Sequence, residues 1–209
     1  MPRKILITAG PTREPIDPVR FIGNRSSGRI GAALAEAALN AGHDVTLILG
    51  PVSVPMPQRT RRIDIDTAAQ LHEAVLREFA NHDLLIMAAA VADFRPINIS
   101  NQKIPRGGRL IIECEPTEDI VAAAGATKRP DQRIIGFDLA VATDLGRAKE
   151  KLDRKNLDLI VCNPAHTMES EKIEPILLWP DGRSEQLSSQ SKSDFATALI
   201  DRAESLFDR

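Results

Sequence analysis

A glycine-rich stretch between two apolar segments, Gly23–Gly31 (GNRSSGRIG), has the residue types that bind phosphate. The alanine-rich segment after it is typical of a helix. The first turn of a helix offers unpaired N–H groups and partial positive charge to an anion. Gly28 and Gly31 would let a ligand and a neighbouring strand approach closely. The stretch therefore predicts a phosphate site at a helix start.

The same stretch is not a P-loop, because Arg29 and Ile30 follow Gly28 where that motif has a lysine and a hydroxyl residue. Four arginines surround it, namely Arg13, Arg20, Arg25 and Arg29. A helix start capped by Ser26 or Ser27, with solvated arginines beside it, is the alternative. The residues alone leave both explanations open.

A second stretch, Met87–Pro96 (MAAAVADFRP), places three alanines and then Asp93 directly after an apolar strand segment. Ligands of doubly wound folds bind at the carboxyl ends of the strands, and small side chains there would leave backbone amides accessible. Asp93 would bind a base, a ribose or a metal. The alternative is tight packing of a helix on the strand, with Asp93 as a helix N-cap.

Two further segments supply cations. Asn101–Gly108 (NQKIPRGG) carries Lys103 and Arg106 and ends in two glycines, a composition suited to a flap that closes over phosphates. Lys151 and Lys155 are four residues apart and so share one helix face. A surface loop and a solvated helix end are the structural alternatives.

Several classes of protein are disfavoured. The chain has no tyrosine and no G-x-G-x-x-G, which argues against a nicotinamide oxidoreductase. A net charge of −2 gives no reason to expect nucleic acid, and the apolar runs are too short to span a membrane. Cys114 and Cys162 are expected to be reduced core thiols of a cytoplasmic protein. No role is assigned to the scattered histidines His43, His72, His82 and His166.

These residues must be positioned by alternating strands and helices. Strands are predicted at 4–8, 44–49, 62–65, 84–87, 110–113, 133–137 and 159–162, a hairpin at 174–187, and helices at 27–41, 68–79, 118–124, 145–155 and 193–207. The alternation predicts an α/β fold in a single domain, 1–209. Its core would be a doubly wound, mostly parallel, Rossmann-like sheet. The hairpin and region 93–113 would form a small antiparallel appendage.

Taken together, five segments resemble phosphopantothenoylcysteine synthetase, the ligase of coenzyme A biosynthesis: ITAGPTREPIDPVRFIGNRSSGRIG, MAAAVADFRP, the lysine of QKIPR, IIGF and EKLDRKNLDLIVCN. In that family the carboxylate of 4′-phosphopantothenate attacks the α-phosphate of a nucleoside triphosphate, CTP in most bacteria. The amine of L-cysteine then attacks the acyl-nucleotide. The bacterial form is commonly joined to a decarboxylase, so a separate decarboxylase is a candidate partner here. The resemblance also implies Mg²⁺ carried by the triphosphate, no protein-bound metal, and a homodimer.

The resemblance assigns roles residue by residue. Asn24 would hold the pantothenate part and the acyl intermediate, beside Arg20, Ala89 and Ala90, and Lys103 would be the flap lysine that promotes acyl-nucleotide formation. The nucleotide would be bound by Ser26, Gly28, Gly31, Asp93, Glu118, Asp119, Ile120, Val121, Phe137, Lys151, Lys155 and Asn163.

The chain departs from the family pattern at four places. Lys103–Arg106 replaces K-x-K-K, Thr117-Glu118 replaces Asn-Pro, 138–141 (DLAV) replaces A-A-E-T, and Gly23 replaces a serine. These differences leave the choice between CTP and ATP open. They also leave a rival hypothesis, a non-catalytic nucleotide-binding or regulatory module of the same fold.

Overall fold

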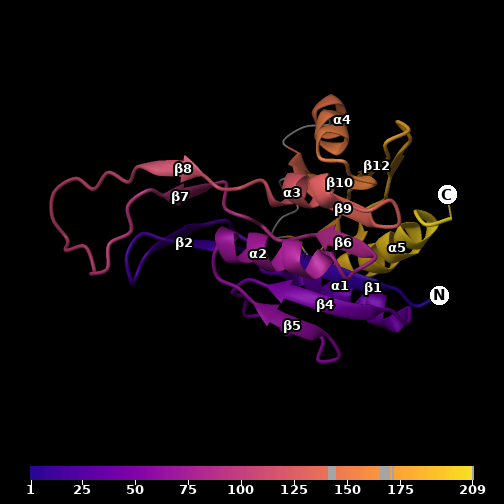
Figure 1. The fold of residues 1–209 in the computed structure, drawn as a ribbon, viewed down its shortest axis with the longest axis horizontal. Coiled ribbons are helices and arrows are strands. Elements are labelled where there is room, and N and C mark those ends of the chain that lie inside the picture. Colours follow the sequence, from indigo (N-terminus) through magenta and orange to yellow (C-terminus); the bar gives the residue numbers. More distant parts are fainter. Residues whose placement is uncertain (141–144, 165–169, 171, 209) are drawn as a thin grey trace.

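The computed structural model describes residues 1–140, 145–164, 170 and 172–208, and its centre is one eight-stranded sheet (Figure 1). Val141 and His166 lie outside the described residues. The strand order is β13-β12-β10-β9-β6-β1-β4-β5. The parallel strands are β1 (Lys4–Ala9), β4 (Asp44–Leu49), β5 (Arg61–Asp64), β6 (Leu84–Met87), β9 (Arg133–Ala140) and β10 (Leu159–Pro164), and the antiparallel strands are β12 (Ile176–Leu178) and β13 (Ser184–Gln186). The predicted doubly wound, mostly parallel sheet is confirmed.

Both faces of the sheet are covered by helices (Figure 1). In β1, Ile5 and Ile7 pack on one side and Leu6 on the other, and all three are buried, as in a parallel sheet with two covered faces. The first face is covered by α1 (Arg29–Asn40) and α5 (Lys192–Ser205), and the second by α2 (Ala68–Phe79), α3 (Ile120–Thr127) and α4 (Leu145–Arg154).

The start of α1 differs from the sequence prediction. Its N-cap is Gly28, at φ 75°, and no side chain caps the helix, so the predicted Ser26 or Ser27 cap is wrong. Instead, the Ser26 hydroxyl accepts from Gly28 N at 3.3 Å and the Ser27 hydroxyl from Arg29 N at 3.4 Å. The left-handed conformation at Gly28 is one that glycine adopts without strain.

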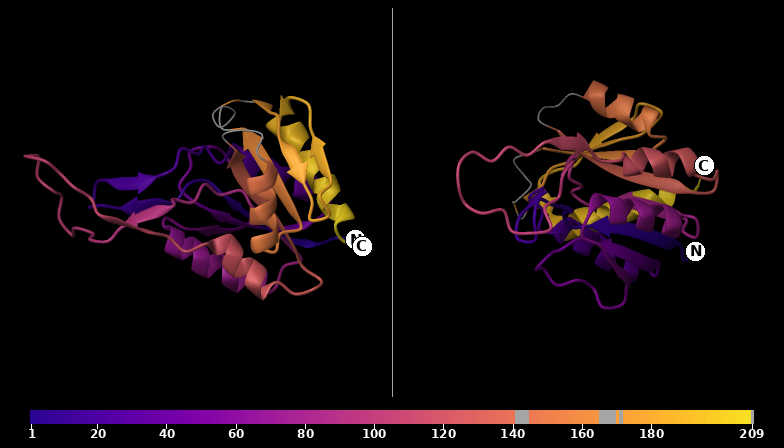
Figure 2. Two further views of the ribbon diagram at one scale, coloured as in Figure 1. Left: turned by 90° about the horizontal axis from the view of Figure 1, so that it is seen from above. Right: turned by 60° about the vertical axis from the view of Figure 1, so that its left-hand side comes forward.

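A long arm projects from the carboxyl ends of the strands, at the left of Figure 1, and both views of Figure 2 show it leaving the body of the molecule. It contains two small antiparallel sheets, β2 (Arg13–Pro15) with β3 (Phe21–Gly23), and β7 (Phe94–Pro96) with β8 (Cys114–Pro116). The predicted strand at 110–113 is wrong, because β8 begins at Cys114. Cys114 is exposed rather than in the core, whereas Cys162 is buried, and both are free.

The predicted hairpin forms, but it is not part of an appendage. Its strands β12 and β13 extend the main sheet through antiparallel pairing of β12 with β10. A further short pair, β11 (Lys172–Ile173) with β14 (Gln190–Ser191), precedes α5. Among the described residues, no helix is long and apolar enough to cross a membrane.

Candidate functional site

A cavity of about 850 Å³ opens at the carboxyl ends of β6, β9 and β10. It lies beside the point between β1 and β6 where the strand order reverses, which is where open α/β sheets bind ligands. Its wall contains most of the predicted site residues, namely Asn24, Ser26, Gly28, Gly31, Ala89, Ala90, Asp93, Glu118, Asp119, Ile120, Val121, Phe137, Lys151, Lys155 and Asn163. Residues far apart in the sequence thus meet at one site.

The glycine-rich turn forms one wall of this cavity. Within the described chain, the backbone N–H groups of Ile30 and Gly31 have no acceptor, so the first turn of α1 presents two free donors. Gly31 itself is required for packing, because a Cβ at this position would lie 2.2 Å from the Cβ of Ala9 in β1. The turn therefore combines close packing on the strand with free amides for an anion.

The alanine segment does not offer the free amides that the sequence suggested. Ala89 N donates to the Thr8 hydroxyl at 3.1 Å, and Ala90 N donates to Gly10 O at 2.8 Å. These bonds tie the segment to the end of β1 and to the loop after it. What this wall contributes is small side chains, which leave room for a ligand.

Asn24 is held at the cavity by a hydrogen bond from its Nδ2 to Val91 O, at 2.6 Å. Opposite, Thr117 donates its hydroxyl hydrogen to Ala92 O at 2.7 Å, so the segment after β8 is fixed to the segment after β6. Glu118 follows and pairs with Arg95 at 3.4 Å. Thr117-Glu118, which stands where the family has Asn-Pro, is thereby built into the wall.

Lys151 on α4 and Lys155, which directly follows α4, are both paired with carboxylates of the same cavity. Lys151 forms an ion pair with Asp138, and Lys155 lies 3.0 Å from Asp119, the N-cap of α3. Burial, followed by the charge of Asp138, raises the pKa of the neighbouring Cys162 thiol to about 11. Cys162 is therefore a protonated, unreactive thiol beside the site.

Two predicted residues, Arg20 and Lys103, do not line the cavity. Arg20 forms an ion pair with Asp17 at 3.1 Å and donates to Ile104 O at 2.6 Å, and Asp17 accepts from Ile104 N at 3.1 Å. This clamp fixes the arm at the residue that follows Lys103. The structure thus places the flap lysine on the arm and not at the cavity wall.

Some cavity residues were missed by sequence reasoning. Asp138 had been noted only as a departure from the family pattern, and Arg147 and Lys192 were not singled out. Arg147 carries a signal that was available, because it lies four residues before Lys151 and continues its helix face. Lys192 carries none, since its position depends on the packing of the last helix.

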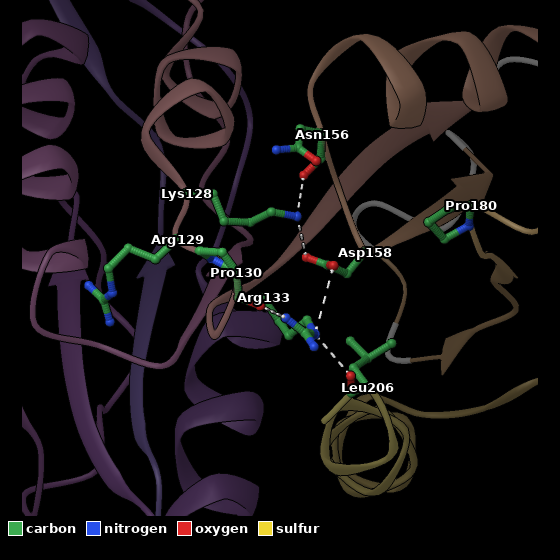
Figure 3. A pocket seen from close by; sticks show the side chains of 8 residues that line it. All are labelled: Lys128, Arg129, Pro130, Arg133, Asn156, Asp158, Pro180 and Leu206. Carbon is green, nitrogen blue, oxygen red and sulfur yellow. Dashed lines mark hydrogen bonds and ion pairs between the residues drawn. The ribbon is translucent and has the colours of Figure 1, made fainter. Parts of the chain in front are cut away.

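A second cavity, of about 460 Å³, lies at the amino ends of β9 and β10, opposite to the first cavity (Figure 3). Figure 3 shows Lys128, Arg133 and Asp158 pointing toward one another. Lys128 Nζ lies 2.9 Å from Asp158 Oδ2, and Arg133 Nε donates to Leu206 O at 2.9 Å. Because these cations are already satisfied by protein groups, we interpret this cluster as a structural link and not as a ligand site.

Residues 1–206 match the family described as the DNA/pantothenate metabolism flavoprotein C-terminal domain. The chain belongs to this family. The chain is similar to a crystal structure of the C-terminal domain of coenzyme A biosynthesis bifunctional protein CoaBC, with 35% sequence identity and a TM-score of 0.86. The similarity covers 99% of this chain and 96% of that one.

Two curated proteins are similar in sequence to this chain over most of its length. A protein named cysteine/cysteine sulfinic acid decarboxylase, from an unknown prokaryotic organism, is 51% identical over 77% of this chain and 45% of its own length. The coenzyme A biosynthesis bifunctional protein CoaBC of Vibrio cholerae is 40% identical over 95% of this chain and 51% of its own length. The chain therefore spans about half the length of these relatives.

Proposed function

We propose that this chain is a phosphopantothenate–cysteine ligase that acts in coenzyme A biosynthesis and forms an acyl-nucleotide from CTP. The observation that carries the proposal is the single cavity in which Asn24, the free amides of the α1 start, and Lys151 and Lys155 meet. Membership of the family and relatives named for coenzyme A biosynthesis support it.

In the first half-reaction, an oxygen of the phosphopantothenate carboxylate forms a bond to the α-phosphorus. The bond from that phosphorus to the bridging oxygen breaks, and pyrophosphate leaves with the electron pair. In the second half-reaction, the cysteine amine attacks the acyl carbon, and the nucleoside monophosphate leaves. Positioning and positive charge, more than a protein nucleophile, are what this chemistry requires.

Each wall of the cavity then has a role. The amides of Ile30 and Gly31 bind phosphate oxygens, Asn24 orients the pantothenate part, and Lys151 and Lys155 bind the nucleotide. A magnesium ion carried by the triphosphate would neutralise phosphate charge. Asp93, an exposed carboxylate on the wall, would bind the nucleotide through its base or ribose.

Lys103 must reach the α-phosphate from the arm. We propose that the chain works as a homodimer whose interface includes the arm, because the arm exposes large apolar side chains: Val19, Phe21, Phe94, Ile97, Ile99, Leu110 and Ile111. Such a concentration of exposed apolar residues on one projection is typical of an association surface. We also propose, from the resemblance alone, that the protein acts with a separate decarboxylase and that it is cytoplasmic.

The test is pyrophosphate release with phosphopantothenate and cysteine, with CTP and ATP compared as the nucleotide. Release that depends on phosphopantothenate, with faster turnover on CTP, is the expected result. A second candidate is a non-catalytic nucleotide-binding module, which the position of Lys103 away from the cavity favours. Tight triphosphate binding without any pyrophosphate release would support that module and contradict the ligase.

A further inference from the structure

The carboxylate of Asp17 makes contacts with two separate segments of the arm. Asp17 is buried, with only 3% of its surface exposed. Its Oδ1 accepts from Val19 N and Arg20 N, both at 2.8 Å, and these bonds close the turn between β2 and β3. Its Oδ2 accepts from Ile104 N at 3.1 Å and lies 3.1 Å from Arg20 Nη2. One oxygen thus holds the turn, and the other holds the segment that contains Lys103.

Ile104 is held through both of its backbone groups, because its N–H donates to this carboxylate and its carbonyl accepts from Arg20 Nη2 at 2.6 Å. Earlier in the same segment, Ser100 N donates to Ile16 O at 3.0 Å, so the segment runs alongside the turn. Lys103 lies between these two sets of hydrogen bonds. Its side chain is exposed and has no hydrogen bond or ion pair to any described residue. The backbone at Lys103 is therefore fixed on both sides, while its ammonium group is free to meet a ligand.

Beyond these contacts the segment has little to restrain it. A Cβ at Gly107 or Gly108 would meet no atom within 4 Å, so this part of the arm is not packed against the rest of the described chain. Ordering such a segment costs conformational entropy. A cation stabilises a transition state most when it is positioned before the reaction. The contacts of Asp17 lie wholly within the arm, so they hold the backbone of Lys103 at the same place on the arm before any ligand binds.

We propose that Asp17 is a positioning residue of the first half-reaction, which acts through Ile104 to hold Lys103 where its ammonium group meets the α-phosphate. This rests on the proposed function. As the substrate carboxylate bonds to the α-phosphorus and pyrophosphate leaves, the reacting phosphate becomes more negative, and a prepositioned ammonium group stabilises that charge. Loss of the positioning should therefore lower the rate of the step and leave triphosphate affinity almost unchanged.

The test is single-turnover release of pyrophosphate at saturating CTP by the wild type, Asp17→Asn, Lys103→Gln and the double variant. In Asp17→Asn an NH₂ group replaces Oδ2 and opposes the N–H of Ile104, while Oδ1 still accepts from the turn. Release should slow about 10- to 100-fold, because small displacements of a catalytic group are costly, and calorimetric CTP affinity should change by less than about twofold.

The double variant separates positioning from a general structural role. If Asp17 acts only through Lys103, the double variant should release pyrophosphate at the rate of Lys103→Gln alone. A structural role would lower the rate further and weaken CTP binding. Asp131→Asn is the matched control and should keep the wild-type rate, because Asp131 also pairs with an arginine, Arg129 at 3.1 Å, but lies far from the arm at the turn before β9.

Amide hydrogen exchange provides a readout that does not depend on product. The Ile104 amide should be protected about tenfold or more in the wild type, and Asp17→Asn should remove most of this protection. Ile104→Pro deletes the same hydrogen bond from its donor side and should repeat the slow release if Asp17→Asn does not fold. A wild-type release rate in either folded variant, or a further loss in the double variant, would overturn the proposal. A wild-type protein that binds CTP but releases no pyrophosphate would contradict the ligase instead, and unchanged protection of Ile104 in Asp17→Asn would still overturn the positioning role.

Discussion

At the scale of single residues, the charge of Lys103 is expected to decide the rate of the first half-reaction. Lys103→Gln should lower pyrophosphate release on the order of 10²–10³-fold, because a preorganised charge donor to the α-phosphate would be lost. Triphosphate affinity should change little, since Lys151 and Lys155 remain on the cavity wall. Single-turnover release of pyrophosphate at saturating nucleotide measures the effect.

Arg106→Gln is the matched control for this prediction, because Arg106 is the other cation of the same arm segment and should matter less. A Lys103→Gln protein that releases pyrophosphate within about threefold of the wild-type rate would contradict the proposed charge stabilisation. The segment that contains Lys103 and Arg106 would then be a surface loop with no role in the first half-reaction.

The two cysteines are expected to differ in reactivity. Cys114 is exposed, whereas Cys162 is buried with its pKa raised to about 11. In the folded protein at pH 8, a thiol reagent should modify one cysteine quickly and the second only after denaturant is added, because the thiolate is the reactive form. Cys114→Ser should remove the fast phase. A fast phase that persists in Cys114→Ser would mean that Cys162 is accessible and reactive.

Which residues the sequence could assign depended on local context. Asn24 and Ser26 lie within one short segment next to a helix start, so their place was predictable. Lys192 was not predictable, because only the packing of α5 on α1 brings it to the cavity. Asp138 was noticed in the sequence, but its partner Lys151 could be recognised only once β9 and α4 were placed.

At the scale of elements, the fit between α1 and β1 depends on Gly31. A Cβ at Gly31 would lie 2.2 Å from the Cβ of Ala9, so Gly31→Ala must push the helix away from the strand. We expect a loss of about 1–3 kcal/mol in the free energy of unfolding, as for other overpacked cores, and weaker triphosphate binding. Urea unfolding and calorimetry measure the two effects.

Gly107→Ala serves as the control, because a Cβ at Gly107 would meet no atom within 4 Å. It should leave the free energy of unfolding within about 0.5 kcal/mol of wild type. If Gly31→Ala also left the free energy of unfolding unchanged, the close approach of α1 to β1 would not be a constraint on this fold.

Asp17 joins the two chain segments of the arm to each other, and this link should depend on pH. Burial raises the pKa of the Asp17 carboxyl, but hydrogen bonds from the amides of Val19, Ile104 and Arg20 outweigh it, so the pKa lies below its ordinary value of 3.8. A lowered pKa means that the carboxylate stabilises the fold above pH 3.8 and loses this effect as the pH falls through the folded-state value.

Asp17→Asn should therefore be less stable than wild type at pH 7, with the difference shrinking in acid. Unfolding by urea at neutral pH and at about pH 3 gives the comparison. A difference of the same size at both pH values would show that the charge of Asp17 does not contribute. The bond from Ile104 N would then act only as a neutral link.

Element types were predictable from the sequence, but some ends and partners were not. Apolar runs such as 84–87 gave correct strands, because both of their faces are buried. The cap of α1 was missed, since Gly28 adopts a left-handed conformation that no serine signal reveals. The predicted hairpin forms, but its pairing with β10 is a long-range contact that local sequence patterns cannot predict.

At the scale of the whole molecule, the two edges of the sheet have different tasks. The carboxyl ends of the strands form a large cavity whose free amides and cations would bind the proposed nucleotide. The amino edge holds the ion cluster of Figure 3, where Lys128, Arg133 and Asp158 satisfy one another and link the last turns of α3 and α5 to the start of β10. Stability and ligand binding should therefore be separable by mutation.

Asp158→Ala tests this separation. Asp158 accepts from Lys128 Nζ at 2.9 Å and from Ile134 N at 2.7 Å, and its side chain is 20% exposed while that of Lys128 is 10% exposed. Removing it leaves a mostly buried ammonium group without its carboxylate, which should cost about 3 kcal/mol in the free energy of unfolding. Urea unfolding measures this loss, and calorimetry should find the triphosphate affinity of the folded variant unchanged.

Asp131→Ala is the matched control, because Asp131 pairs with Arg129 at 3.1 Å but its side chain is 68% exposed. Its removal should therefore cost less than about 1 kcal/mol in the free energy of unfolding. Equal losses in the two variants would show that the cluster is an ordinary surface ion pair. A fall in triphosphate affinity in folded Asp158→Ala would show that the two edges are coupled through β10.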